Sequence, residues 1–313
     1  MKIVVYSPFA AAEMEAALNG LPGFHAVVAK DKQAALAHIA DAEGISIPMS
    51  LFDDDVGRAL TQAKQIRWIH FVSSGTDPLL KWPAGPGVVV TNSADAWAPT
   101  VAEHAVAMLL GVLRQFPAMN DLRATQTWAQ LDLRPKLRSL EASTVLILGF
   151  GAIGQRAAEL MRPFNPRVIA VGRTARAHPL VERVAGVGEI DALLPQVDAI
   201  VAALPSSPQT RHLMSAERLA LLPNNAVIVN VGRGETFDEA ALTAALIEGR
   251  IAGAGLDVYE REPLPKDNPL WSAPNLILSP HVAGVGRSHL FGRLVACCVR
   301  SAKGLSLNGQ PPA

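Results

Sequence analysis

One apolar run that ends in three spaced glycines limits the possible folds of this chain more than any other feature. The stretch VLILGFGAIGQRAAELM places Gly149, Gly151 and Gly154 directly after a strand-like run and at the start of a helix-like one. This G-x-G-x-x-G spacing lets the backbone turn tightly and approach a pyrophosphate, to which the helix N-terminus offers amide donors. A glycine-bearing turn without any ligand has the same pattern. The motif therefore predicts a strand, a turn and a helix, and favours a dinucleotide bound there.

Two series of short apolar runs alternate with helix-like segments along the chain. Such alternation predicts parallel sheets covered by helices, and the continuous apolar runs of the second series indicate strands buried on both faces. We therefore predict an α/β fold with two Rossmann-like domains and parallel sheets, in which the N-terminal domain is flavodoxin-like and is completed by a C-terminal helix from about residue 287. The predicted strands are KIVVY, HAVVA, GISIP, IRWIHFV and GVVVTN in the first series, and STVLILGFG, RVIAVG, VDAIVAALP, NAVIVNVG, AGAGLDV and LILSPHV in the second.

Between the two series lies PTVAEHAVAMLLGVLRQF, residues 99–116, which is apolar on nearly all sides. Pro99 and Glu103 suit the start of a helix, so we expect a buried helix that begins at Pro99. Residues 117–140 lose this periodicity and carry Trp128. We interpret them as an excursion that packs on something outside its own domain, with packing of Trp128 within its own chain as the alternative.

Composition excludes several classes of partner. Half of the residues are hydrophobic, 18% are charged, and 28 basic residues balance 28 acidic ones, so no net charge attracts nucleic acid or an anionic membrane. The two cysteines are adjacent, at 297 and 298, and the N-terminal segment has no signal-peptide pattern, so we expect a cytoplasmic protein. There is no H-E-x-x-H, C-x-x-C or G-x-S-x-G pattern, and we predict no metal site.

The segment after the second strand of the glycine-motif unit predicts which cofactor binds. An NAD site usually has an acidic residue about 20 residues beyond the glycines, for the ribose 2′-hydroxyl. This chain instead has Gly172, Arg173, Thr174, Ala175 and Arg176. A guanidinium can bind a 2′-phosphate through two parallel hydrogen bonds, and Thr174 is an additional donor. We therefore predict NADP(H) as the preferred cofactor with NAD(H) as possible, unless the two arginines are only solvated loop cations.

Three polar residues each follow a different strand of the second series. Arg233 follows NAVIVNVG, Glu262 follows AGAGLDVYER, and His281 follows NLILSP. The carboxyl ends of parallel strands meet at one edge of a sheet, where ligands bind. Any one of the three residues can be structural, but together they offer a cation for a carboxylate and a histidine with a carboxylate partner. For His70 and His104, which lie among apolar residues, we expect places in the core.

At these positions the chain resembles the D-isomer-specific 2-hydroxyacid dehydrogenases. The resemblance covers nearly the whole length through SSGTD, TVAEHAVAMLL, LGFGAIG, NVGRGE, GLDVYEREPLP and SPHVAG, in that order. It implies that Arg233 binds substrate, that His281 is the acid/base and that Glu262 is its partner. It also implies substrate-binding amides at Ser74 and Gly75. The implied cofactor-binding residues are Val101, Gly149, Gly151, Ala152, Ile153, Gly154, Arg173, Thr174, Arg176, Leu204, Pro205, Thr210, Val231, Gly232, Asp257, His281 and Gly284.

For Asp257 the resemblance implies contact with the nicotinamide carboxamide, and a structural role at the end of its strand is the alternative. The resemblance further implies a substrate domain of residues 1–97 and 284–313, a cofactor domain of residues 98–283, and a homodimer formed through residues 99–140, with Trp128 at the interface or near the neighbouring active site.

The resemblance and the arginine loop together predict an NADPH-preferring reductase of a small 2-keto acid, with glyoxylate or hydroxypyruvate as the nearest types. Reduction of such an acid requires a hydride at the carbonyl carbon and a proton on its oxygen, which the imidazolium of His281 can donate. Two alternatives stay open. One is an NAD-dependent D-2-hydroxyacid dehydrogenase with a larger apolar substrate, and the other is a dinucleotide-sensing scaffold similar to transcriptional corepressors of the same fold.

Overall fold

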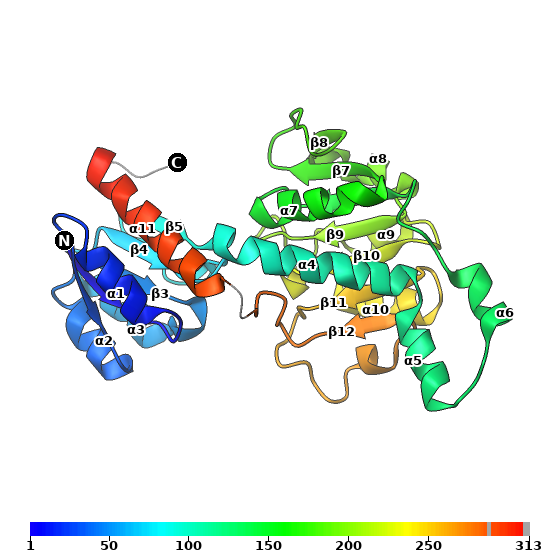
Figure 1. The fold of residues 1–313 in the computed structure, drawn as a ribbon, viewed down its shortest axis with the longest axis horizontal. Helices are drawn as coiled ribbons and strands as arrows, with labels where there is room; N and C mark the ends of the chain where they lie inside the picture. The colour runs from blue at the N-terminus through cyan, green and yellow to red at the C-terminus, as the bar shows by residue number, and fades with distance from the viewer. Residues whose placement is uncertain (287–288, 309–313) are drawn as a thin grey trace. The chain divides into compact units, whose positions relative to one another are not determined.

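The chain divides into two compact units. The computed structural model describes residues 1–286 and 289–308. Residues 1–97 form the first unit together with the C-terminal segment from Gly286, and Ala98–Val285 form the second. Each unit is built around its own parallel sheet, as Figure 1 shows by the two groups of arrows.

The first unit contains a five-stranded sheet in the order β2-β1-β3-β4-β5. This is the flavodoxin-like order, which the sequence predicted for the N-terminal domain. Its strands are β1 Lys2–Val5, β2 His25–Val28, β3 Gly44–Ile47, β4 Trp68–Phe71 and β5 Val89–Asn92. Its helices are α1 Ala11–Asn19, α2 Lys32–Ile39, α3 Asp54–Gln62 and the C-terminal α11 Leu290–Asn308.

Side chains of each strand in this sheet alternate between two hydrophobic layers. Ile3 and Val5 of β1 point to one layer, which contains Leu294 of α11 and residues of α1. Val4 points to the other layer, which α2 and α3 cover. Figure 1 shows α11 beside α1, so the C-terminal helix completes the N-terminal unit as predicted. Burial of both faces explains why the strands of the first series consist mainly of apolar residues.

His70 of β4 occupies the core place that the sequence predicted for it. It is fully buried, and its two ring nitrogens are hydrogen-bonded to the hydroxyls of Thr91 and Ser93 at 2.9 and 3.1 Å. Burial lowers the pKa of His70 to about 3, so the ring is neutral at physiological pH.

The second unit contains a seven-stranded parallel sheet in the order β12-β11-β10-β9-β6-β7-β8. Its strands are β6 Thr144–Leu148, β7 Arg167–Gly172, β8 Arg183–Gly186, β9 Ala199–Ala202, β10 Val227–Asn230, β11 Gly253–Leu256 and β12 Leu276–Leu278. Its helices are α5 Phe116–Ala124, α6 Gln130–Leu133, α7 Ala152–Met161, α8 Ile190–Leu193, α9 Ala216–Ala220 and α10 Glu239–Ile247. The predicted α/β class with two parallel sheets is confirmed. The edge strand β8, which has only four residues and the sequence RVAG, was not predicted from the sequence.

Helix α4, Ala94–Leu113, begins five residues before the predicted start at Pro99, so that prediction was wrong. The Asn92 side chain accepts a hydrogen bond from the Ala94 amide, and the Ser93 carbonyl accepts one from Ala96, which starts the helix earlier. Pro99 therefore lies inside the helix. By length and composition α4 is apolar enough to cross a membrane, but 61% of its most apolar window is buried inside the structure, as in the core helix of a globular protein.

The segment after α4 forms two short helices, α5 and α6, where the sequence analysis expected an excursion without periodicity. Figure 1 shows both helices projecting from the end of α4, away from the sheet of their unit. Trp128 is 91% exposed and Leu131 is 76% exposed. Neither side chain packs on its own unit, which leaves an apolar surface on the excursion.

Candidate active site

The glycine motif forms the predicted turn between β6 and α7. Gly149 has a φ of 97°, and a Cβ at this position would lie 2.8 Å from the Ala203 carbonyl oxygen. A Cβ at Gly154 would lie 2.2 Å from the Gly149 oxygen, so only glycine allows the turn to close. No side chain caps α7 at Gly151, where an added Cβ would point into open space. The first amides of α7, at Ala152 and Ile153, have no side-chain cap at Gly151 and could bind a pyrophosphate.

The loops after β9 and β10 lie against this turn at the carboxyl edge of the sheet. A Cβ at Gly232 would lie 2.7 Å from the backbone nitrogen of Leu204, and the Val231 amide donates to the Ala202 carbonyl. The hydroxyl of Thr210 donates to the Pro205 carbonyl at 2.7 Å and closes the loop after β9. Because β6 and β9 are neighbours in the sheet but not in the chain, this edge is the switch point at which such sheets bind ligands.

The loop after β7 exposes the arginines that the sequence analysis singled out. Arg173, Thr174 and Arg176 are all exposed, and within residues 1–286 and 289–308 neither guanidinium has an ion-pair partner. The backbone of Arg176 pairs with Val184 through hydrogen bonds of 3.0 and 2.9 Å. This pairing brings Nη1 of Arg176 within 3.8 Å of the position that a Cβ of Gly172 would take. Positive charge thus lies at the end of β7, where NAD sites usually have an acidic residue.

His281 and Glu262 form a carboxylate–imidazole pair. Nδ1 of His281 lies 2.7 Å from Oε2 of Glu262, and the side chains are 43% and 36% exposed. The hydrogen bond to Glu262 raises the pKa of His281, against the opposing effects of burial and of the Arg233 charge. Burial alone would raise the pKa of Glu262, but the hydrogen bonds from His281 and the Tyr259 amide outweigh it and lower that pKa. Both directions favour the charged forms.

The backbone at His281 has a left-handed conformation, with a φ of 53°. Non-glycine residues rarely adopt this conformation, and surrounding contacts must hold it in place. The His281 amide donates to the Asp257 carbonyl at 2.8 Å. The amides of Val282 and Ala283 donate to the Asp257 carboxylate at 2.9 and 3.0 Å.

Asp257 is therefore a structural anchor of the His281 turn. Its side chain is buried, with 1% of the residue exposed, and also accepts a 2.6 Å hydrogen bond from the Ser279 hydroxyl. This geometry accounts for the structural role that the sequence analysis left open, while contact with a nicotinamide carboxamide stays a prediction.

His104 does not occupy the core place that the sequence analysis expected. Its side chain is 29% exposed, and its Nε2 lies 3.0 Å from the Ser279 hydroxyl and 3.8 Å from Oδ1 of Asp257. Since the Ser279 hydroxyl donates to Asp257, it accepts from His104, and Nε2 therefore carries a proton. The apolar neighbours of His104 in helix α4 did not indicate this polar contact, because Ser279 and Asp257 are far away in the sequence.

Arg233 follows β10 and precedes a short 3-10 helix, Gly234–Thr236. Its Nη1 donates to the Gly232 carbonyl at 2.7 Å, while its own carbonyl accepts from the Asn230 side chain. The positive charge of Arg233 lowers the pKa values of both Glu262 and His281. The structure thus brings together the three residues of the predicted catalytic set at the ends of adjacent strands.

The remaining predicted residues lie in several places. Ser74 and Gly75 follow β4 in the first unit, where the Gly75 carbonyl accepts a hydrogen bond from the Ser73 hydroxyl. Val101 is buried in α4, and Gly284 accepts a hydrogen bond from the Thr100 hydroxyl. Ser74 and Gly75 belong to the first unit, and their role in substrate binding stays a prediction.

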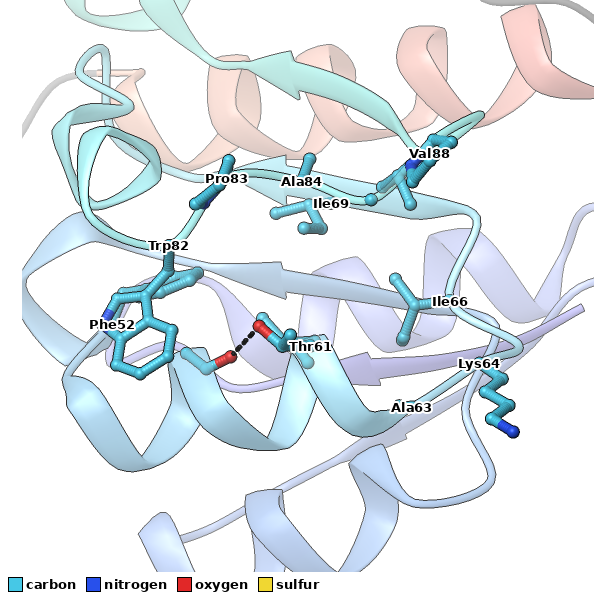
Figure 2. A pocket seen from close by; sticks show the side chains of 14 residues that line it. Phe52, Thr61, Ala63, Lys64, Ile66, Ile69, Trp82, Pro83, Ala84 and Val88 are labelled. Atoms are coloured by element: carbon cyan, nitrogen blue, oxygen red, sulfur yellow. Dashed lines mark hydrogen bonds between the residues drawn. The ribbon is translucent and has the colours of Figure 1, made fainter.

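A cavity of about 270 Å³ in the first unit offers a different environment. It lies between α3 and the loop of residues 82–88, and Figure 2 shows Phe52 and Trp82 at one end and Lys64 directed away at the other. Its lining residues, all of them described, include no predicted site residue. The polar groups suited to keto-acid chemistry lie at the strand ends of the second unit and not in this hollow.

Sequence comparison agrees with the geometry of the second unit. The model of the NAD binding domain of the D-isomer specific 2-hydroxyacid dehydrogenases matches residues 106–283, more than half of the chain. The glyoxylate reductase of Thermococcus gammatolerans is 30% identical over 289 residues, which are 90% of this chain and 84% of that protein.

Solved structures match over both units. A D-isomer specific 2-hydroxyacid dehydrogenase from Xanthobacter autotrophicus Py2, in complex with NADPH and MES, has a TM-score of 0.84 at 27% identity and covers 99% of this chain and 96% of its own. The NADPH-dependent glyoxylate/hydroxypyruvate reductase from Sinorhizobium meliloti, in complex with NADP and sulfate, has a TM-score of 0.80 at 27% identity with the same coverage. The chain therefore belongs to the D-isomer specific 2-hydroxyacid dehydrogenase family of NAD(P)-dependent oxidoreductases.

Proposed function

We propose that this protein is an NADPH-preferring reductase that converts a small 2-keto acid of the glyoxylate or hydroxypyruvate type to the D-2-hydroxy acid. The observation that carries the proposal is the 2.7 Å contact between His281 and Glu262, beside the charge of Arg233. Relatives named glyoxylate reductase and glyoxylate/hydroxypyruvate reductase support the substrate class. The second unit would bind the cofactor and the first would contribute to substrate binding.

The acid–base chemistry follows from the hydrogen bond at Nδ1 of His281. Glu262 occupies this nitrogen, so the proton available to a substrate is on Nε2. The hydrogen bond to Glu262 raises the pKa of His281 and so favours the imidazolium, which can donate a proton as the carbonyl oxygen gains negative charge. A nicotinamide cofactor held in the second unit would supply the hydride that this reduction requires. The ring is left neutral, and solvent can reprotonate it because the side chain is 43% exposed.

Arg233 would bind the substrate carboxylate. A guanidinium pairs with a carboxylate through two parallel hydrogen bonds and limits the keto acid to one orientation at the cofactor. The amides at Ser74 and Gly75 are the predicted second contact for this carboxylate.

The preference for NADPH rests on Arg173 and Arg176. Both guanidiniums are exposed at the end of β7 and have no described ion-pair partner, so they are available to a 2′-phosphate. The complexes of two structural relatives with NADPH or NADP support this choice. The open amides at the start of α7 would hold the pyrophosphate, with Asp257 and Val101 toward the nicotinamide.

We also propose a homodimer that covers the apolar excursion of α5 and α6. The exposed Trp128 and Leu131 support it, since large apolar side chains that lie together on a surface commonly mark an interface. Light scattering coupled to gel filtration at micromolar concentration would give twice the chain mass. A monomeric mass at that concentration would contradict the proposal.

The first test of function is the oxidation rate of NADPH and NADH, followed at 340 nm, with glyoxylate, hydroxypyruvate and a larger apolar 2-keto acid. We expect turnover of the small acids, faster with NADPH, and chiral analysis should find the D-hydroxy acid. Fastest turnover of the larger acid with NADH would support the NAD-dependent alternative. Tight dinucleotide binding without turnover of any 2-keto acid would support the sensing scaffold instead.

A further inference from the structure

Tyr259 lies close to the proposed catalytic residues, and its hydroxyl contacts two backbone carbonyls. It follows β11 by three residues and is 8% exposed. Its hydroxyl donates to two carbonyls, those of Leu256 at 3.0 Å and Ser279 at 2.9 Å. One proton is shared between the two acceptors, so the hydroxyl bridges the ends of the adjacent strands β11 and β12.

The Ser279 carbonyl links this hydroxyl to the acid–base histidine. The same carbonyl accepts a 3.1 Å hydrogen bond from the backbone amide of His281. The left-handed φ of 53° at His281 makes its ring position depend on such backbone contacts. A change at the Tyr259 hydroxyl therefore reaches His281 through one shared oxygen.

The backbone of Tyr259 contacts the other member of the pair. Its amide donates to Oε1 of Glu262 at 3.1 Å, while Oε2 of that carboxylate binds His281. Gly234, directly after Arg233, lies against the same peptide, because a Cβ at Gly234 would come within 1.9 Å of the Tyr259 carbonyl carbon. Burial raises the pKa of the Tyr259 hydroxyl, which therefore stays a donor at all physiological pH values.

We propose that Tyr259 is a positioning residue for the carboxylate–imidazole pair, through its amide on Glu262 and its hydroxyl on the carbonyl that holds the His281 backbone. The expected effect of Tyr259 on kcat rests on the proposed function. Its expected effect on the alignment and the pKa of His281 does not. The charged groups whose fields reach His281 in the described structure are Glu262, Arg233 and Asp257. Tyr259 acts on the alignment of the first of these.

The test is Tyr259→Phe in the full-length protein, which removes one oxygen and keeps the ring in its buried place. A matched control is Tyr6→Phe, because Tyr6 is the other of the two tyrosines in the chain and lies in the first unit. With the proposed keto acids we expect Tyr259→Phe to lower kcat about tenfold, the value of one net hydrogen bond, with little change in KM. Tyr6→Phe should match wild type.

A second measurement does not depend on turnover. The pKa of His281 can be followed by NMR of ¹³C-labelled histidine rings, with the signal assigned from its loss in His281→Gln. We expect Tyr259→Phe to move this pKa down toward the ordinary histidine value. Loss of the hydroxyl frees the Ser279 carbonyl that holds the His281 backbone, and Glu262 stabilises a displaced imidazolium less. An unchanged His281 pKa, with only a lower melting temperature, would overturn the proposal and leave Tyr259 a structural residue.

The two measurements separate this inference from the proposed function. If wild type reduces no 2-keto acid but the His281 pKa falls in Tyr259→Phe, the positioning role stands and the proposed function fails. If Tyr259→Phe does not fold, 3-fluorotyrosine can be incorporated in a Tyr6→Phe background, where it enters at position 259 alone. Its more acidic hydroxyl should shift the pKa of His281, and no shift would overturn the inference.

Discussion

Two loops at the carboxyl edge of the second sheet differ sharply in how firmly they are held. In the turn after β12, the amides of three consecutive residues, His281, Val282 and Ala283, all donate to Asp257. In the loop after β7, backbone hydrogen bonds at Arg176 hold one residue, and the side chains of Arg173 and Thr174 extend into solvent.

The difference matches what the two loops would have to do. Proton transfer needs a donor within hydrogen-bond reach of one atom, so a small displacement of His281 is costly. Recognition of a phosphate by arginine needs positive charge and flexible reach, which exposed side chains provide. Changes in the turn after β12 should therefore act mainly on kcat, and changes in the loop after β7 mainly on the KM of the cofactor.

The largest effect is expected from His281→Gln. Loss of the general acid should lower kcat about 10²- to 10⁴-fold at pH 7, because glutamine cannot donate the proton that the carbonyl oxygen needs. Dinucleotide affinity, measured by quenching of tryptophan fluorescence, should change little. A variant with near wild-type kcat would show that His281 has no part in proton transfer. The firm hold on the turn after β12 would then not be explained by catalysis.

Glu262→Gln should give a smaller loss, with a distinct pH dependence. The carboxylate raises the pKa of His281, so its removal lowers that pKa. Reduction requires protonated His281 and declines as pH rises through its pKa. In the variant this decline should begin at a lower pH than in wild type, while rates at acidic pH stay closer together. A pH profile of kcat/KM for the keto acid from pH 5 to 9 measures the shift, and an unmoved profile would exclude coupling between the pair.

The residues that carry charge could be predicted from the sequence, since each follows a recognisable strand. Arg233, Glu262 and His281 come after β10, β11 and β12, which are neighbours in the sheet, so the rule for strand ends brings them together. The glycine turn was also predictable, because the spacing of Gly149, Gly151 and Gly154 after a strand is typical of one kind of turn.

The residues that hold the site in place were not predictable in this way. The roles of Tyr259 and Ser279 depend on backbone carbonyl oxygens and on the φ of His281, and no side-chain pattern encodes either. His104 is separated from Ser279 by 175 residues, so its apolar neighbours in the sequence suggested a core residue. The early start of α4 likewise depends on two hydrogen bonds, which the Asn92 side chain and the Ser93 carbonyl accept from the amides of Ala94 and Ala96, and which outweigh the usual preference for proline in the first turn.

The smallest expected effect is in the exposed loop, where the double variant Arg173→Ala, Arg176→Ala should change cofactor choice and leave kcat nearly unchanged. Loss of two charge-assisted contacts to a 2′-phosphate should raise the KM for NADPH about tenfold or more, with little change for NADH, which has no such phosphate.

A matched control is Arg162→Ala, which removes an arginine at the far end of α7. The ratio of kcat/KM for the two cofactors measures the preference. An unaltered ratio would mean that the arginines are solvated loop cations, and a fall in kcat with both cofactors would mean that this loop, despite its exposure, takes part in aligning the reaction.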